Sequence, residues 1–284
     1  MRAIDTHIHP STKETVNTLA KFHQAMEKHY KFKFQVKTEE QMAKDIVDCD
    51  VKALLVACDA ETNTGLPRTS NDYVAKVVKD HPEAFAGGYG SVDPWKGEIA
   101  IKEADRAIKE LGLVGLKFQP IQQGFFPNDR RFYPLWEKCV ELKCSLQFHT
   151  GVTGLGSGLP GGMGLKLMYT NPMYLDEIAA DFPELKVIAL HASFPWQDEM
   201  LAVLQHKANV FNELSGWLPK YFPPQLKREI NGRLQDKFMF GSDYPAISPT
   251  RWLDSFESEG YKPEVIEKVF YKNAQRLYGS KLKI

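Results

Sequence analysis

Eight short apolar runs recur along the chain, separated by longer segments with helical periodicity. The runs are continuous rather than alternating, which is typical of strands that are buried on both faces of a parallel sheet. The predicted strands are Ala3–His9, Ala53–Asp59, Phe85–Asp93, Val114–Pro120, Ser145–Gly151, Val187–Ser193, Val210–Gly216 and Phe238–Pro245.

The segments between these runs predict helices. In one of them Ile101, Ala104 and Ile108 follow helical spacing, with Lys and Glu between them. The clearest predicted helices are Ser70–Lys79, Gly97–Leu111, Arg131–Leu142 and Pro172–Asp181. Eight strand–helix units in succession favour an α/β fold, a single closed (β/α)8 TIM barrel that spans residues 1–284.

Two segments exceed what a strand–helix connection needs, and we expect both to lie over the barrel mouth. Residues 11–37 are rich in aromatic and basic side chains, and residues 150–170 hold seven glycines. A mobile Gly-rich loop after a barrel strand often acts as a lid. A phosphate cradle is less favoured, because no Gly-Lys-Ser/Thr follows the glycines.

Composition narrows the class of protein. The length of 284 residues suits one barrel, and 36 basic side chains balance 36 acidic ones, which argues against a nucleic-acid partner. We expect no membrane association, because no apolar run approaches about 18 residues and no signal-peptide pattern is seen. The four cysteines form no metal or disulfide pattern, so we expect reduced thiols and a cytoplasmic location.

Ionisable residues stand at the predicted carboxyl ends of several strands. His7 and His9 are two residues apart in the first strand, so alternation places both side chains on one face. Three later strands end at His149, His191 and Asp243. Side chains at the carboxyl ends of barrel strands meet at one rim, which is where TIM barrels carry their chemistry.

Five motifs in this order resemble the amidohydrolase superfamily, in the amidohydrolase-related branch that includes aminocarboxymuconate-semialdehyde decarboxylase. The motifs are Ile4-Asp5-Thr6-His7-Ile8-His9-Pro10, Gly115-Leu116-Lys117-Phe118, Phe148-His149-Thr150-Gly151, Leu190-His191-Ala192-Ser193 and Phe240-Gly241-Ser242-Asp243-Tyr244-Pro245. The resemblance implies a metal-dependent TIM barrel. With the first motif at residue 5, we expect no flanking β-sandwich domain.

The resemblance implies that one divalent metal ion is bound by His7, His9, His149 and Asp243. Nitrogen and carboxylate donors without a thiolate suit Zn²⁺ best, and Mn²⁺ or Fe²⁺ remain candidates. His191 would stand beside the metal as a general acid or base, or as an electrophilic donor. Asp243 would serve as the catalytic base as well as a ligand.

Lys117 has several open interpretations. It lies near the end of the fourth strand, where some superfamily members carry a carboxylated lysine that bridges two metals. Lys117 is also a candidate for binding a substrate carboxylate or carbonyl. A structural ion pair with Asp59, Glu213 or another acid at the rim is as consistent with its position.

Other candidate substrate contacts follow predicted strands. Arg68 and Arg251 are placed to clamp an anionic group, although solvated surface arginines are the simpler interpretation. Trp196 and Trp217 are placed to wall a pocket or to pack in the core. Glu213, which ends the seventh strand, is a candidate for orienting a histidine ligand.

The family resemblance implies a small-molecule substrate that is a carboxylate. It also implies a homodimer. The first hypothesis is hydrolysis, in which a metal-activated water attacks an ester, lactone or amide of a small organic acid. The alternative is a non-oxidative decarboxylase (carboxy-lyase) that acts on an aromatic or muconate-type carboxylate at the same site. Two further possibilities are a trinuclear phosphoesterase and a metal-binding barrel without catalysis. Few additional acidic residues stand at strand ends, and no ligand position is missing, so both are less favoured.

Overall fold

The sheet is an eight-stranded parallel barrel in which each strand pairs with the next along the chain, β1 to β8. The computed structural model describes residues 1–31 and 33–284. Every predicted strand is confirmed, with somewhat earlier ends. The strands are β1 Ala3–Ile8, β2 Val51–Val56, β3 Phe85–Gly90, β4 Gly115–Phe118, β5 Ser145–His149, β6 Lys186–Leu190, β7 Val210–Glu213 and β8 Phe238–Met239.

The chain segment that follows β8 closes the barrel onto β1. Thr6 N donates to Phe240 O at 3.0 Å, His9 N donates to Tyr244 O at 2.8 Å, and Asp243 N donates to His7 O at 3.1 Å. These bonds run past the end of β8, so they hold Asp243 beside the histidines of the first strand. The predicted (β/α)8 barrel is confirmed.

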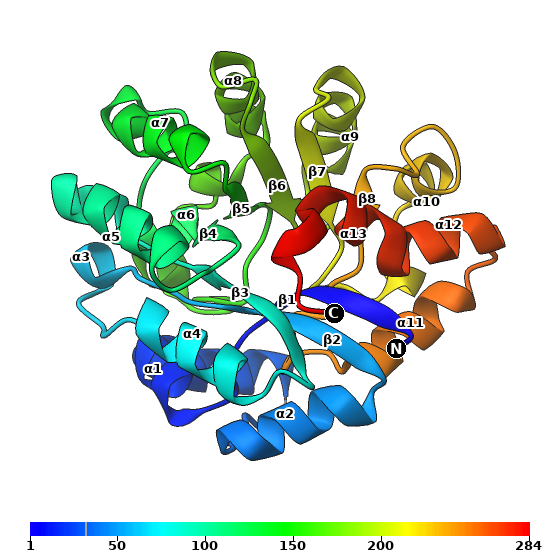
Figure 1. Cartoon of the computed structure of the whole chain (residues 1–284), viewed down its shortest axis with the longest axis horizontal. Coiled ribbons are helices and arrows are strands. Elements are labelled where there is room, and N and C mark those ends of the chain that lie inside the picture. The colour runs from blue at the N-terminus through cyan, green and yellow to red at the C-terminus, as the bar shows by residue number, and fades with distance from the viewer. Residues whose placement is uncertain (32) are drawn as a thin grey trace.

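Helices surround the barrel (Figure 1). The predicted helices are confirmed as α4, α5, α7 and α8, within two residues at each end. The helices are α1 Lys13–Tyr30, α2 Glu39–Asp48, α3 Glu61–Thr64, α4 Asn71–Asp80, α5 Glu98–Lys109, α6 Pro120–Gln123, α7 Tyr133–Glu141, α8 Met173–Asp181, α9 Gln197–His206, α10 Pro224–Ile230, α11 Pro249–Glu257, α12 Pro263–Glu267 and α13 Asn273–Tyr278. Among the described residues, no helix combines the length and the apolarity that crossing a bilayer requires.

Strand alternation divides the apolar side chains into two cores. In β2, Ala53 and Leu55 pack outward against the helices, while Leu54 and Val56 pack inside the barrel. Leu282 and the end of α13 join the inner core at the amino ends of the strands, where Lys186 Nζ, at the start of β6, donates to Leu277 O at 2.8 Å. Figure 1 shows α13 and the carboxyl terminus across this end of the barrel. The carboxyl ends of the strands are therefore left for polar side chains.

The two predicted insertions contact each other. The first contains α1, and the second contains the short 3-10 helices η3 Pro160–Gly164 and η4 Leu167–Thr170. A Cβ atom at Gly154 would lie 3.2 Å from Met26 Cε, and one at Gly158 would lie 2.4 Å from His29 Nδ1. Phe32, inside the first insertion, lies outside the described residues. That these segments cover the barrel mouth stays a prediction.

Candidate metal centre

Three metal-binding side chains converge where β1 meets the segment after β8. His7 Nε2 lies 3.3 Å from His9 Nε2 and 3.6 Å from Asp243 Oδ1, and His9 Nε2 lies 3.5 Å from the same oxygen. His7 is fully buried, whereas 23% of the Asp243 side chain is exposed. One ligand atom from each residue falls within 4.8 Å of the others. The cluster is thus buried on one side and open on the other.

The first strand, β1, has an irregularity in its pairing beside the cluster. Pairing with β2 is interrupted between Asp5 and Ile8, and such irregularities commonly re-aim side chains beside functional sites. Asp5 Oδ1 accepts hydrogen bonds from His7 N at 3.2 Å and from Ser242 N at 3.0 Å. This one buried carboxylate oxygen ties both ligand-bearing segments together.

Gln147 orients the ring of His7. Its Nε2 donates to Thr6 O at 3.0 Å, which turns its Oε1 toward His7 Nδ1, 3.4 Å away. The amide oxygen can only accept, so the contact favours a proton on Nδ1 and a bare Nε2 that faces His9. Histidines that bind a metal ion usually donate their other ring N–H to such an acceptor, which fixes the orientation of the ring.

His149 lies near the cluster but outside the group of three. Its ring centroid is 4.6 Å from that of His191. His149 Nε2 is buried without a hydrogen-bond partner among the described residues. A buried nitrogen without a hydrogen-bond partner is costly unless it binds a ligand or a metal ion, so His149 stays a candidate fourth ligand.

His191 sits after β6 in a strained backbone conformation, with φ of 70°. Its Nδ1 lies 2.9 Å from Ser215 Oγ and 3.2 Å from Ser215 O. Ser215 Oγ donates in turn to Glu213 Oε2 at 2.8 Å, and Ser215 N donates to Glu213 Oε1 at 2.6 Å. Glu213 therefore reaches a histidine through Ser215. Asp243 also has a positive φ, 61°, and strain at both residues is typical of a functional site.

Lys117 is buried beside these groups, with 2% of its surface exposed. It pairs in register with Gln147 on the neighbouring strand. Its Nζ donates to Gln119 Oε1 at 2.8 Å, and no carboxylate among the described residues forms an ion pair with it. The predicted ion pair with Asp59 or with Glu213 is wrong. Asp59 is engaged by Lys96, and Glu213 by Ser215. Burial lowers the pKa of Lys117, and the charge of Asp243, another acid at the rim, opposes that shift.

Burial sets the electrostatics of the site. It raises the pKa of Asp5 and that of Asp243 to about 7 each, and it lowers the pKa of His191 to about 4. Burial also lowers the pKa values of His7 and His9, and the charge of Lys117 lowers both further. The imidazoles are therefore neutral near pH 7, the form that binds a metal ion.

The predicted substrate-binding arginines do not join the cluster. Arg68 is half-exposed and pairs with Glu61 at 3.2 Å. Arg251 lies in the first turn of α11 rather than in a loop, because Ser248 caps that helix by accepting from Arg251 N at 3.3 Å. In the described part of the chain, neither guanidinium forms a hydrogen bond or ion pair with the clustered donors.

The two predicted tryptophans are both partly buried. Trp217 follows β7 and packs on Phe194, with ring centroids 5.5 Å apart. Trp196 precedes α9 as its N-cap residue, and its backbone N donates to Ser193 O at 2.6 Å. Phe194, three residues after His191 in the chain, is 45% exposed, so it forms an exposed aromatic surface with Trp217. Whether either tryptophan contacts a substrate stays a prediction.

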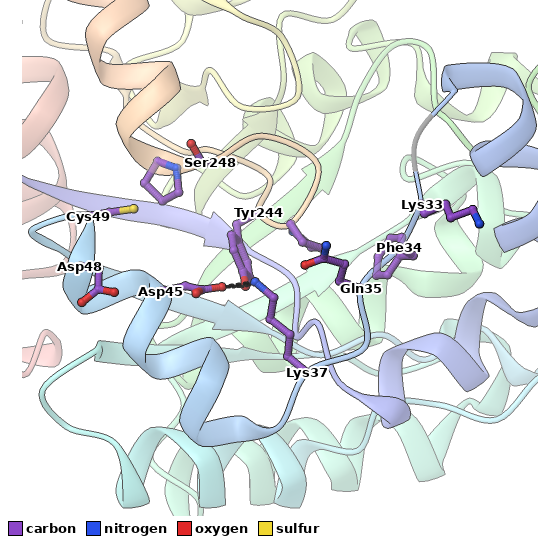
Figure 2. Close-up of a pocket in the computed structure, with 11 residues that line it drawn as sticks. Lys33, Phe34, Gln35, Lys37, Asp45, Asp48, Cys49, Tyr244 and Ser248 are labelled. Atoms are coloured by element: carbon purple, nitrogen blue, oxygen red, sulfur yellow. Dashed lines mark hydrogen bonds and ion pairs between the residues drawn. The ribbon is translucent and has the colours of Figure 1, made fainter.

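A cavity of about 410 Å³ lies behind the cluster, on the side of α2 and α11. Figure 2 shows Tyr244 and Lys37 together at its centre. The hydroxyl of Tyr244 donates to Asp45 Oδ2 at 2.6 Å. The lining contains Tyr244 and Pro245, directly after Asp243, and none of the three clustered donors. This cavity is therefore adjacent to the candidate centre rather than part of it.

The donor set fits a divalent cation. Two neutral imidazole nitrogens and a carboxylate oxygen face one point, and the orphaned His149 Nε2 is close by. Nitrogen donors with a carboxylate suit Zn²⁺ or Mn²⁺. Space is kept open by glycine, because a Cβ at Gly216 would lie 2.8 Å from His191 Nδ1 and 3.4 Å from Asp243 Oδ2.

A sequence model of the family described as Amidohydrolase matches residues 4–280. The chain belongs to the amidohydrolase family. The resemblance inferred from the five motifs is thereby confirmed, and the protein is an enzyme of the amidohydrolase superfamily.

The curated relatives of this amidohydrolase-family chain include decarboxylases and a hydratase. The 2-amino-3-carboxymuconate-6-semialdehyde decarboxylase of Dictyostelium discoideum is 34% identical over 79 residues, which span 28% of this chain and 22% of that enzyme. Decarboxylase orsB of Emericella nidulans is 23% identical and is matched over 74% of this chain and 75% of its own length. A 2-keto-4-carboxy-3-hexenedioate hydratase of Sphingobium is 31% identical over 43% of this chain and 38% of the hydratase.

Solved structures confirm the TIM-barrel fold. An uncharacterized TIM-barrel protein of Bordetella bronchiseptica superposes with a TM-score of 0.78 at 23% identity, over 99% of both chains. A dihydroxybenzoic acid decarboxylase of Polaromonas, solved with manganese and the inhibitor 2-nitroresorcinol, gives a TM-score of 0.73 at 19% identity. It covers 97% of this chain and 96% of its own. At these identities the likeness concerns the fold.

Three residues of the candidate centre were not predicted from the sequence: Asp5, Gln147 and Ser215. A signal existed for Gln147, because it shares the inward face of β5 with His149, and a buried polar residue there needs a partner. Asp5 stands in a fully buried strand, which is unusual for a carboxylate. Ser215 carried no comparable signal.

Proposed function

We propose that this protein is a metal-dependent decarboxylase that removes CO₂ non-oxidatively from a small aromatic or muconate-type carboxylate. Three curated relatives are decarboxylases, one of them matched over 75% of its own length, and a similar solved structure is a dihydroxybenzoic acid decarboxylase. These findings favour the alternative hypothesis over hydrolysis of an ester, lactone or amide.

The observation that carries the proposal is Lys117. Lys117 is buried beside the histidines and forms no ion pair within the described residues; burial lowers its pKa, and the charge of Asp243 offsets only part of that cost. An anion bound at the site would offset more of it. A substrate carboxylate or phenolate supplies that anion. Hydrolysis of a neutral ester needs no such buried cation, whereas decarboxylation begins from a bound carboxylate.

His7, His9 and Asp243 would hold the metal ion, with His149 as the fourth ligand. When bound, the cation supplies a Lewis acid that draws electron density from the substrate oxygens. Zn²⁺ remains a candidate for this chain, and Mn²⁺ gains support from the Polaromonas enzyme, which holds manganese. A dimer, a cytoplasmic location and carboxylation of Lys117 stay predictions.

The residues of the chain divide the remaining work. Lys117 binds and orients the substrate anion, and the surface formed by Phe194 and Trp217 excludes water from one side. Decarboxylation replaces a carbon–carbon bond by a carbon–hydrogen bond, so one proton must reach the carbon as CO₂ leaves. Asp243 and His191 are the proton-carrying groups at the site, and we assign this proton to one of them.

The proposal is tested with a panel of aromatic and muconate-type carboxylates, assayed for CO₂ release, beside a panel of lactones assayed for acid release. The expected result is CO₂ release from at least one carboxylate and no acid release from the lactones. Acid release without CO₂ from any substrate would return the assignment to hydrolysis. Asp243→Asn is the matched inactive control, because it removes a charge and a proton site but little volume.

A further inference from the structure

We propose that Ser215 is a positioning residue, which holds His191 in one tautomer with its proton on Nδ1 and its Nε2 bare. Two oxygens of Ser215 approach the same ring nitrogen, Oγ at 2.9 Å and the backbone carbonyl oxygen at 3.2 Å. A carbonyl oxygen can only accept a hydrogen bond, so the nitrogen that faces it must carry the proton.

Glu213 settles the direction of the serine hydroxyl. Ser215 Oγ donates to Glu213 Oε2 at 2.8 Å, which leaves only the lone pairs of Oγ for His191. Both carboxylate oxygens are committed to Ser215, because Oε1 accepts from its backbone N at 2.6 Å. Within the described residues no lysine or arginine pairs with Glu213. A carboxylate that is buried in this way, with both oxygens on one serine, serves to orient that serine.

The backbone packs tightly around the hydrogen bonds that link Glu213, Ser215 and His191. A Cβ at Gly241 would lie 1.9 Å from Glu213 Oε1, so only glycine at 241 admits the carboxylate. A Cβ at Gly216 would lie 2.8 Å from His191 Nδ1. Glycines on two separate loops therefore make room for the two ends of the same hydrogen-bonded chain.

The consequence concerns which direction a proton can move at His191. Its ring meets those of His7 and His149 edge-on, with centroids 5.7 Å and 4.6 Å away. A neutral ring with its proton on Nδ1 has an acceptor at Nε2 and no donor at that nitrogen. His191 therefore takes a proton or a hydrogen bond at Nε2 before it can give one. This consequence for turnover rests on the proposed decarboxylase function, whereas the tautomer itself does not.

The tautomer is measured directly by long-range ¹H–¹⁵N NMR of the zinc-loaded, ¹⁵N-histidine-labelled protein, with His191→Gln used to assign the resonances. In the wild-type protein we expect protonated Nδ1. In Ser215→Ala we expect the Nε2-protonated form to rise about 10-fold, as for loss of one hydrogen bond. On a substrate found by the decarboxylase panel, kcat should fall about 10-fold with KM changed less than about 2-fold.

Three further variants separate positioning from packing. Ser215→Thr keeps the hydroxyl and should restore the tautomer and most of the turnover. Glu213→Gln places an amide donor against Oγ, turns the hydroxyl toward His191 and should shift the tautomer in the same direction as Ser215→Ala. Ser145→Ala removes another buried hydroxyl, bonded to Tyr89 at 2.6 Å on the inner-core side, and should leave His191 unchanged.

An unchanged tautomer in both Ser215→Ala and Glu213→Gln overturns the inference. So does a Ser215→Thr protein as impaired as Ser215→Ala, because the loss would then come from packing. If no carboxylate on the panel releases CO₂, the proposed function fails while the NMR result still decides the role of Ser215.

Discussion

Gly216 lies against the ring of His191, so closely that a Cβ at position 216 would meet Nδ1 at 2.8 Å. Its φ of +76° also lies in the left-handed region. Gly216→Ala should therefore lower the unfolding free energy for two reasons. The left-handed backbone costs about 1–2 kcal/mol, and the clash with the His191 ring costs about 1–3 kcal/mol. The kcat of this variant should fall as the ring is displaced.

Gly260→Ala is the matched control for this prediction. Gly260 has nearly the same φ, +75°, but nothing lies within 4 Å of its Cβ position. It should show only the backbone cost in urea unfolding, with unchanged activity. Equal losses in the two variants would mean that the contact with His191 is not tight.

Lys117→Met should leave the metal-free protein equally stable or about 1 kcal/mol more stable, because it removes a buried ammonium that forms no ion pair within the described residues. The same change should lower kcat/KM for a carboxylate substrate by about 100-fold or more, since the anion loses its partner. Lys96→Met provides the contrast, because it leaves buried Asp59 with only the distant Arg68, 3.9 Å away, and should destabilise. A destabilised Lys117→Met protein would show that Lys117 has a structural counter-ion after all.

Asp5→Ala should cost about 2–5 kcal/mol of unfolding free energy, because it leaves two buried N–H groups, on His7 and Ser242, without an acceptor. Asp5→Asn keeps the accepting oxygen and removes a carboxyl whose pKa burial raises to about 7. The asparagine variant should stay within about 1 kcal/mol of wild type. Similar losses in both variants, measured by urea unfolding, would point to the charge rather than the hydrogen bonds.

His191 makes the stability of the metal-free protein depend on pH. Its pKa in the folded state is about 4, below the ordinary value of 6.5, so below pH 6.5 the unfolded chain binds the proton more tightly. The stability gained from the neutral ring is complete above pH 6.5 and is lost as the pH falls toward 4. Between pH 6.5 and pH 4, the unfolding free energy of the His191→Gln protein should fall by about 3 kcal/mol less than that of the wild type. Parallel curves for the two proteins would mean that the ring is well solvated.

The strands and the places of ionisable residues at their ends could be read from the sequence, because both depend on local pattern, whereas the identity of the metal ligands came from the resemblance of the five motifs. Apolar runs such as Leu146–Phe148 predict buried strands whatever surrounds them, and a histidine or aspartate at the end of a run predicts a place at the rim. His7, His9 and Asp243 do meet there. That meeting depends only on parallel strands closing into a barrel.

The contacts around those donors depend on exact three-dimensional placement and were not predictable. The register shift in β1 is not visible in its apolar pattern, and it brings Asp5 onto the loop of Ser242. The sequence suggests acidic partners for Lys117. In the structure the register of β4 and β5 aligns Lys117 with Gln147, and its Nζ donates to Gln119. Arg251 follows the eighth predicted strand, but it belongs to the first turn of α11, because the Ser248 side chain caps that helix ahead of it.

The central claim is that His7, His9 and Asp243 hold one divalent metal ion. Elemental analysis after expression in metal-replete medium tests it most directly, on wild type, the His7→Gln/His9→Gln double variant and the exposed control His206→Gln. We predict close to one Zn or Mn per chain in the wild type and control, and less than about a tenth of that in the double variant. A wild-type protein without metal, or a double variant that keeps it, would contradict the account.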